Sequence, residues 1–159
     1  MYQYKKSKPI KLGPIKTSST ELVDIAKGWI ALSFAFALLY SGTYLLGGKE
    51  MNNILSINFG LVFLISLFTA GLGFVLHELA HKFVAQHYGC IAEFRAFDKM
   101  LYLAVGLAAV IGWIFAAPGA VMISGTVTRK ENGIISIAGP ATNFVLAGIF
   151  WFISQSVPI

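Results

Sequence analysis

The sequence predicts an α-helical multi-pass membrane protein, with a bundle of three spanning helices, one further re-entrant or spanning segment and a small membrane-associated β-hairpin. Two observations predict this class. The hydrophobic fraction is 57% and the charged fraction only 12%, about half the charge of a typical soluble domain. Asp, Glu, Lys and Arg are also absent from four stretches: 29–48, 51–77, 100–128 and 132–159. Each stretch has the roughly 20 residues that a helix needs to cross the hydrocarbon core.

The chain begins with a basic segment. Only Glu21 and Asp24 oppose its six lysines, which are Lys5, Lys6, Lys8, Lys11, Lys16 and Lys27. Positive residues beside a first spanning helix are retained in the cytoplasm. We therefore expect a protein of the cell membrane with its N-terminus in the cytoplasm. We divide the chain into a basic cytoplasmic tail, 1–19, and a membrane core, 20–159. A solvated tail next to a lipid bilayer explains the charge better than a nucleic-acid surface, so no nucleic-acid partner is expected.

Capping residues place the first two helices. Residues 1–17 contain two prolines and a glycine and are expected to be irregular. Three N-cap candidates then precede a helix that runs to about residue 46; they are Ser18, Ser19 and Thr20. A second apolar helix is expected from about 54 to 88, with Gly89 as its C-cap.

A polar connector, 91–99, leads into the apolar stretch 100–118. If that stretch crossed the membrane, Arg129 and Lys130 would lie outside the cell, against the positive-inside rule. Its glycines and Pro118 permit a chain that enters the membrane and returns on the same side. We therefore favour the re-entrant path.

Residues 119–137 are expected to form a β-hairpin. Asn132-Gly133 lies between two β-prone runs, which is a hairpin signal. Gly139-Pro140 then suits the first turn of a last helix, which should end near Ser156.

Two of the three histidines and one acid lie together at the end of the second apolar helix. His77 and His81 are one helical turn apart on one face, so their imidazoles can bind one tetrahedral metal, with Zn–N bonds of about 2.0–2.1 Å. Glu78 can act as a base toward a water that the metal makes acidic. This is the H-E-x-x-H pattern of zinc proteases. The alternative is a helix end among lipid headgroups, but an acid within the membrane usually has a partner or a function. The sequence thus predicts a Zn²⁺ centre, with Glu78 as the catalytic residue.

At these residues the chain resembles the site-2 protease family of intramembrane zinc metalloproteases (peptidase family M50), especially its small prokaryotic members. The resemblance covers about residues 20–157. It rests on four blocks: His77-Glu78-Leu79-Ala80-His81, Tyr88-Gly89, Pro118-Gly119-Ala120-Val121 and Ile137-Ala138-Gly139-Pro140-Ala141-Thr142-Asn143. The last block is similar to the family's G-P-x-x-N helix start. The resemblance implies cleavage of transmembrane protein substrates, with zinc bound by His77 and His81.

The resemblance also implies substrate-binding residues. A substrate helix must unwind before its peptide bond can be reached, and an exposed strand edge can then bind it by β-addition. The strand expected to do so contains Ala120, Val121 and Met122. Asn143 has two readings, packing within the bundle or a role near the site, and we include it among the substrate-binding candidates.

One departure from the family leaves other functions open. Family members supply a third zinc ligand, an Asp in a segment such as N-x-x-P-x-x-x-L-D-G, which this sequence lacks. We expect a fragment without the C-terminal helices that carry it; the alternative is an inactive homologue acting as a membrane scaffold or substrate-binding module. Two further rivals are a prenyl-protein type of zinc protease, with Glu131 as a ligand, and a proton-linked transporter or channel. The sequence specifies neither the substrate nor the oligomeric state.

Overall fold

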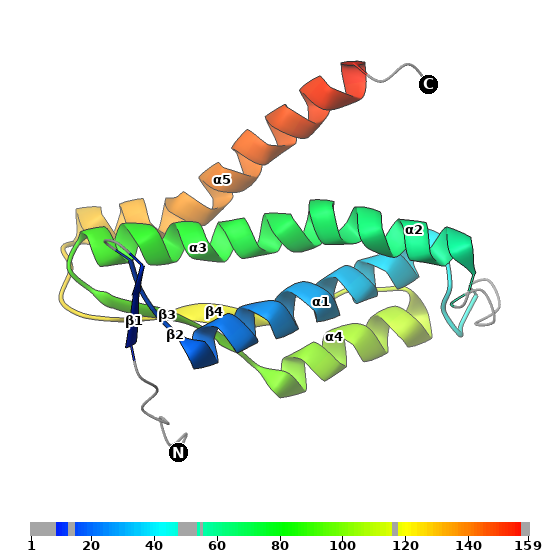
Figure 1. Ribbon diagram of the computed structural model, residues 1–159, viewed down its shortest axis with the longest axis horizontal. Coiled ribbons are helices and arrows are strands. Elements are labelled where there is room, and N and C mark those ends of the chain that lie inside the picture. Colours follow the sequence, from blue (N-terminus) through cyan, green and yellow to red (C-terminus); the bar gives the residue numbers. More distant parts are fainter. Residues whose placement is uncertain (1–8, 13–14, 48–53, 55, 116–117, 157–159) are drawn as a thin grey trace.

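The long helices of this chain lie side by side, accompanied by two small two-stranded sheets (Figure 1). The computed structural model describes residues 9–12, 15–47, 54, 56–115 and 118–156. The elements in chain order are β1 (Pro9–Leu12), β2 (Ile15–Ser18), α1 (Ser19–Ser41), α2 (Ile57–Ser66), the π-helical turn η2 (Leu67–Gly71), α3 (Leu72–His87), β3 (Ile91–Ala96), α4 (Asp98–Ile111), β4 (Gly119–Ser124) and α5 (Arg129–Ser156).

Within the described residues, three helical segments are long and apolar enough to cross a membrane. They are Ser19–Ser41 with 23 residues, Ile57–His87 with 31 and Arg129–Ser156 with 28. The second segment consists of α2, η2 and α3 without a break. The predicted mostly helical architecture with three such helices is therefore confirmed by length and composition.

The ends of the first two segments follow the predicted capping chemistry. The hydroxyl of Ser18 accepts the Glu21 N–H at 3.2 Å and caps the start of α1. α1 ends earlier than expected, because Gly42 adopts a left-handed conformation with φ +68°. After α3, Gly89 (φ +80°) and Cys90 donate backbone hydrogen bonds to Gln86 and Ala85, which is a Schellman C-cap. The N-terminal segment was expected to be irregular, but β1 and β2 pair within it as an antiparallel hairpin.

The π-helical turn η2 lies where the long helix packs closely on α1. The indole N–H of Trp29 donates to the Leu67 carbonyl at 2.9 Å. A Cβ built on Gly71 would overlap Ser33 Oγ and come within 2.7 Å of Trp29 Cδ1. Small residues allow this close approach between helices in apolar surroundings. Gly71 therefore fixes the distance between α1 and the helix that carries the histidines.

The main sheet joins two strands that are far apart in sequence. β3 pairs with β4 in antiparallel register, with Phe94 opposite Val121 and Ala96 opposite Gly119. Residues 97–118 therefore leave the sheet and return to it. Within them, the 14-residue α4 is about 21 Å long, shorter than the roughly 30 Å hydrocarbon core. α4 alone is therefore too short to span such a core. The expected polar connector 91–99 is mostly the strand β3.

The predicted β-hairpin at 119–137 is wrong. Only Gly119–Ser124 is a strand, and its partner is β3. Asn132-Gly133 lies inside α5, because Thr128 and Glu131 form a capping box that starts the helix before them. The Thr128 N–H donates to Glu131 Oε2 at 2.6 Å, and the Glu131 N–H donates to Thr128 Oγ1 at 3.3 Å. Gly139-Pro140 is accordingly within the last helix and not at its start.

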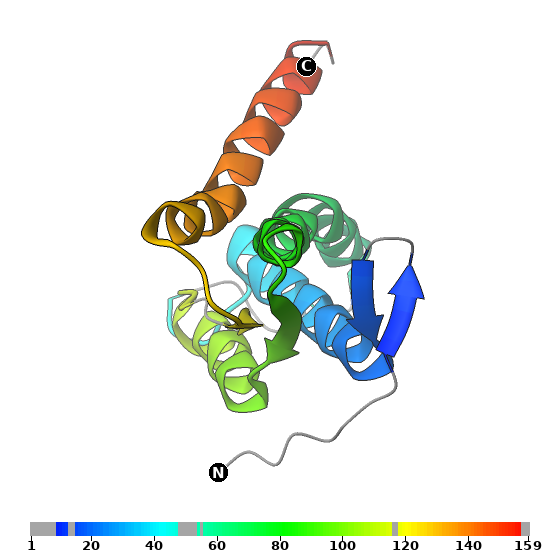
Figure 2. The same ribbon diagram turned by 90° about the vertical axis from the view of Figure 1, so that its left-hand side faces the viewer.

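Helix α3 is at the centre of this arrangement. Its most extensive packing is against the first half of α5, and the β3–β4 sheet lies between it and α4 (Figure 2). The second half of α5 diverges from α3 beyond Pro140 (Figure 1). A proline inside a helix removes a backbone hydrogen bond and commonly bends it. A cavity lies between α1, α3 and the part of α5 after Pro140.

We expect Gly71→Ala to destabilise the protein. The added methyl group has no space against Ser33 and Trp29, and overpacking of this kind costs about 1–3 kcal/mol. The thermal midpoint in detergent should fall. Gly60→Ala is the matched control, because a Cβ at Gly60 meets nothing within 4 Å and alanine favours a helix by about 1 kcal/mol over glycine. Equal midpoints for the two variants would contradict the close packing of α1 on η2.

Candidate metal centre

Helix α3 brings the two predicted histidine ligands together. His77 and His81 lie one turn apart, and their Nε2 atoms are 3.1 Å from each other. Two nitrogens bound at about 2.0–2.1 Å to a tetrahedral zinc would be about 3.4 Å apart. Small rotations of the two rings therefore suffice for both to bind one ion.

The outer nitrogens of both rings are already bonded. His81 Nδ1 lies 2.7 Å from the Ile135 carbonyl oxygen, which can only accept, so Nδ1 carries the hydrogen. Nε2 of the neutral His81 ring then carries a lone pair and no hydrogen. When one ring nitrogen of a histidine binds a metal, the other usually donates a hydrogen bond to an acceptor such as a backbone carbonyl.

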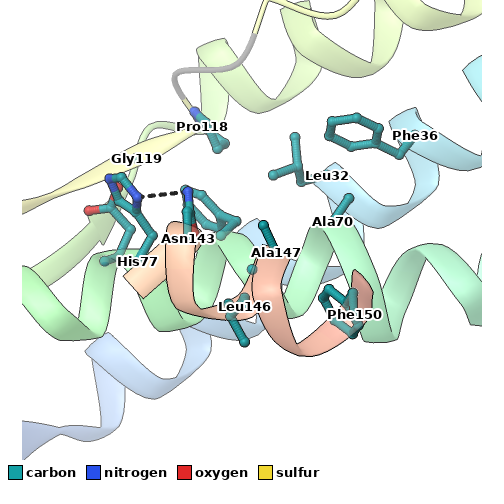
Figure 3. A pocket seen from close by; sticks show the side chains of 13 residues that line it. Leu32, Phe36, Ala70, His77, Pro118, Gly119, Asn143, Leu146, Ala147 and Phe150 are labelled. Carbon is teal, nitrogen blue, oxygen red and sulfur yellow. Dashed lines mark hydrogen bonds between the residues drawn. The ribbon is translucent and has the colours of Figure 1, made fainter. Parts of the chain in front are cut away.

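His77 is held by the predicted residue Asn143. Its Nδ1 lies 3.0 Å from Asn143 Nδ2 (Figure 3). With the amide NH₂ donating, His77 carries its hydrogen on Nε2 and donates it to His81 Nε2. A half-turn of the amide presents its oxygen instead, which accepts from Nδ1–H and leaves Nε2 free for a metal. Asn143 thus contacts a candidate ligand, and its predicted part in substrate binding stays a prediction.

Gly139 allows α5 to lie against the two imidazoles. A Cβ built there would overlap Nε2 of both His77 and His81. The next residue, Pro140, has no N–H, and the hydroxyl of Thr142 donates back to the Ala138 carbonyl at 2.9 Å. Both features bend helices. The G-P-x-x-N block therefore supplies the close approach, the bend and the contact to His77.

Glu78 is bonded to the edge of the sheet. Its Oε2 accepts the Val121 N–H at 3.1 Å. This N–H points away from β3, so Val121 and its partner Phe94 form a pair that is not hydrogen-bonded across the ladder. The predicted strand of Ala120, Val121 and Met122 thus lies beside α3, with its outer edge toward Glu78.

An apolar cavity of about 590 Å³ ends at these residues. It lies between α1, α3 and α5, and Figure 3 shows most of the side chains around it. Its polar lining consists of His77, Glu78 and Asn143, and its largest apolar side chains are Leu32, Phe36, Phe74, Leu146 and Phe150. Ala120, Val121 and Met122 do not line it; Pro118 and Gly119 do.

The two histidines fit zinc as part of a ligand set. Within the part of the chain that the structure describes, no group of three or more His, Cys, Asp or Glu side chains is placed to hold a metal. The rival ligand Glu131 is engaged in the capping box with Thr128. Sequence reasoning read Gly139 as a helix-start residue and missed its contact with both imidazoles, for which the spacing in the sequence carried no signal.

Gly139→Ala should weaken zinc binding. The methyl group would displace both Nε2 atoms, so we expect the zinc affinity in a chelator competition to fall at least tenfold. Gly148→Ala is the control on the same helix, because a Cβ there meets nothing within 4 Å. Unchanged zinc affinity in Gly139→Ala would contradict the placement of α5 against the imidazoles.

Asn143→Leu should also weaken zinc binding, because His77 loses the partner that orients its ring. Loss of such a partner commonly reduces metal affinity about 10–100-fold. Asn143→Asp keeps an acceptor for His77 Nδ1–H and should bind zinc within a few-fold of the unmodified chain. An affinity loss of equal size in both variants would argue against this orienting role.

Comparison with known proteins gives one informative match. No protein-family model matches the chain, and no solved structure matches it. A curated relative from Methanocaldococcus jannaschii is 39% identical over 138 residues. The aligned part is 86% of this chain and 63% of the relative, so the chain spans less than two thirds of the relative's length. The relative is named "Putative zinc metalloprotease MJ0611", which is the class of protein that the H-E-x-x-H segment indicates.

Proposed function

We propose that this chain is part of a zinc-dependent intramembrane endopeptidase of the site-2 type, which cleaves membrane-protein substrates. One observation carries the proposal: His77 and His81 face each other through Nε2 at 3.1 Å while Nδ1 of each is bonded to α5. The similarity to a protein named as a putative zinc metalloprotease supports the broader assignment to zinc metalloproteases.

His77 and His81 would hold the ion. Zinc bound there supplies Lewis-acid polarisation of a carbonyl and makes water more acidic. Glu78 lines the same cavity as His77 and accepts the proton of the attacking water. It then passes that proton to the leaving amine, as a general base that becomes a general acid. A catalytic zinc usually has three protein ligands, so a third residue must complete the set.

The substrate binds as an extended chain along the outer edge of β4. The Val121 N–H on this edge is bonded only to a side chain, Glu78, within the described residues. Pairing with a substrate backbone carbonyl would release Glu78 toward the water. The apolar cavity beside it suits the side chains of an unwound transmembrane segment, which is why we favour a membrane-protein substrate.

The position of the site along its helix agrees with cleavage near one membrane face. His77 is 20 residues after the start of the Ile57–His87 segment, about 30 Å along an α-helix. A helix that enters the hydrocarbon core near Ile57 brings His77 to the opposite boundary. With a cytoplasmic N-terminus and α1 crossing first, that boundary is the cytoplasmic one.

Glu78→Gln tests the chemistry. It should bind zinc as tightly as the unmodified chain and, in the whole endopeptidase with its complete ligand set, lose about 10²–10⁴-fold in cleavage rate, the usual contribution of a general base. The measurement compares zinc content and cleavage of a fluorogenic transmembrane peptide, with enzyme and substrate in the same vesicles. His81→Ala should lose both zinc and cleavage.

Two outcomes would favour the rival functions. Zinc binding by His77 and His81 without cleavage of any transmembrane peptide would favour an inactive scaffold or substrate-binding module. The absence of zinc binding, together with proton movement across vesicles that depends on Glu78, would favour a transporter.

A further inference from the structure

A buried ion pair includes Lys82, the residue that follows the candidate ligand His81 in the sequence. Lys82 Nζ is 2.6 Å from Glu21 Oε2, and the two residues are only 1% and 0% exposed. Neither takes part in the proposed chemistry. Two charges in so apolar a chain need strong directional contacts to be retained in the interior.

Glu21 connects three elements through its two carboxylate oxygens. Oε2 accepts from Lys82 on α3 and from Thr17 Oγ1 at 2.7 Å on β2. Oε1 accepts the Phe94 N–H at 2.8 Å on β3. The first turn of α1, which carries Glu21, is thereby bonded to both α3 and the sheet.

Both outer edges of the β3–β4 sheet are bonded to glutamates at the same strand pair. Phe94 and Val121 are opposite each other, and their N–H groups point outward in opposite directions. Glu21 accepts from Phe94 on the β3 edge, and Glu78 accepts from Val121 on the β4 edge. Lys82 follows Glu78 by four residues and lies on the same face of α3. α3 is therefore connected to both edges of the sheet at two successive turns. Glu78 contacts the β4 edge directly, and Lys82 reaches the β3 edge through Glu21.

We propose that Glu21 and Lys82 are positioning residues for the candidate metal centre. Their ion pair fixes the rotation of α3 relative to the β3–β4 sheet. This rotation keeps Glu78 at Val121 and directs His77 and His81 toward α5. The expected effect on zinc affinity rests on the proposed function. The fixed rotation of α3 does not, because it rests on the contacts among α1, α3 and the sheet.

The experiment compares Lys82→Met, Glu21→Gln and the double variant Glu21→Gln/Lys82→Met. Lys82→Met leaves an unpaired buried carboxylate and should lower the thermal midpoint. In the double variant neither charge of the pair remains, so the midpoint should recover. The amide that replaces the Glu21 carboxylate can still accept from Phe94, but α3 is no longer bonded to it. Lys27→Met is the control, because Lys27 on α1 forms an exposed pair with Asp98 at 3.2 Å, with side chains 46% and 55% exposed.

Two readouts separate positioning from stability. The first is hydrogen exchange of the Val121 amide, measured by NMR on metal-free protein in detergent micelles. The second is zinc affinity by chelator competition. In the double variant we expect exchange at Val121 to rise at least tenfold and zinc affinity to fall at least tenfold, despite the recovered midpoint. Lys27→Met should change neither.

Recovery of Val121 protection and zinc affinity together with the midpoint would overturn the proposal, because the pair would then serve stability alone. The amide readout needs no metal, so it also separates this inference from the proposed function. If even the unmodified chain binds no zinc, the metalloprotease function fails, and faster exchange at Val121 would still support the positioning role. Zinc binding by the unmodified chain with unchanged exchange in the variants would overturn only the positioning role.

Discussion

The need to pair polar groups inside an apolar chain governs this structure. Four polar residues on two turns of α3 each have a partner on another element. His77 contacts Asn143 and His81 contacts the Ile135 carbonyl, both on α5; Glu78 accepts the Val121 N–H of β4, and Lys82 pairs with Glu21 of α1. An unpaired polar group buried among apolar side chains is costly. The contacts of α3 therefore determine where α5, β4 and the start of α1 can lie. The same contacts orient the two imidazoles.

Local signals predicted the helices and the histidine pair. Ser18 as an N-cap, Gly89 in a C-cap and three of the four charge-free stretches each depend on neighbours in sequence, and each is found as expected. The H-E-x-x-H spacing places its histidines together because a helix alone sets their separation. The hairpin prediction at 119–137 is wrong because the capping box of Thr128 and Glu131, which is also a local signal, starts a helix ahead of Asn132-Gly133.

The remaining features depend on contacts that sequence spacing does not encode. β3 and β4 are separated by the excursion 97–118, so neither strand indicates its partner. The contact of Gly139 with His77 and His81 arises only when α5 lies along α3. The turn η2 needs the Trp29 indole from another helix. Asn143 and Val121 were expected near the site, but their partners, His77 and Glu78, became evident only from the packing.

The central claim is that α3 and α5 together present two imidazoles to one metal ion. X-ray absorption at the zinc edge of the zinc-loaded chain in detergent tests it most directly. The account predicts two imidazole nitrogens at about 2.0–2.1 Å and one fewer in His77→Ala or His81→Ala. A spectrum without imidazole scattering, or one that neither substitution changes, would contradict it.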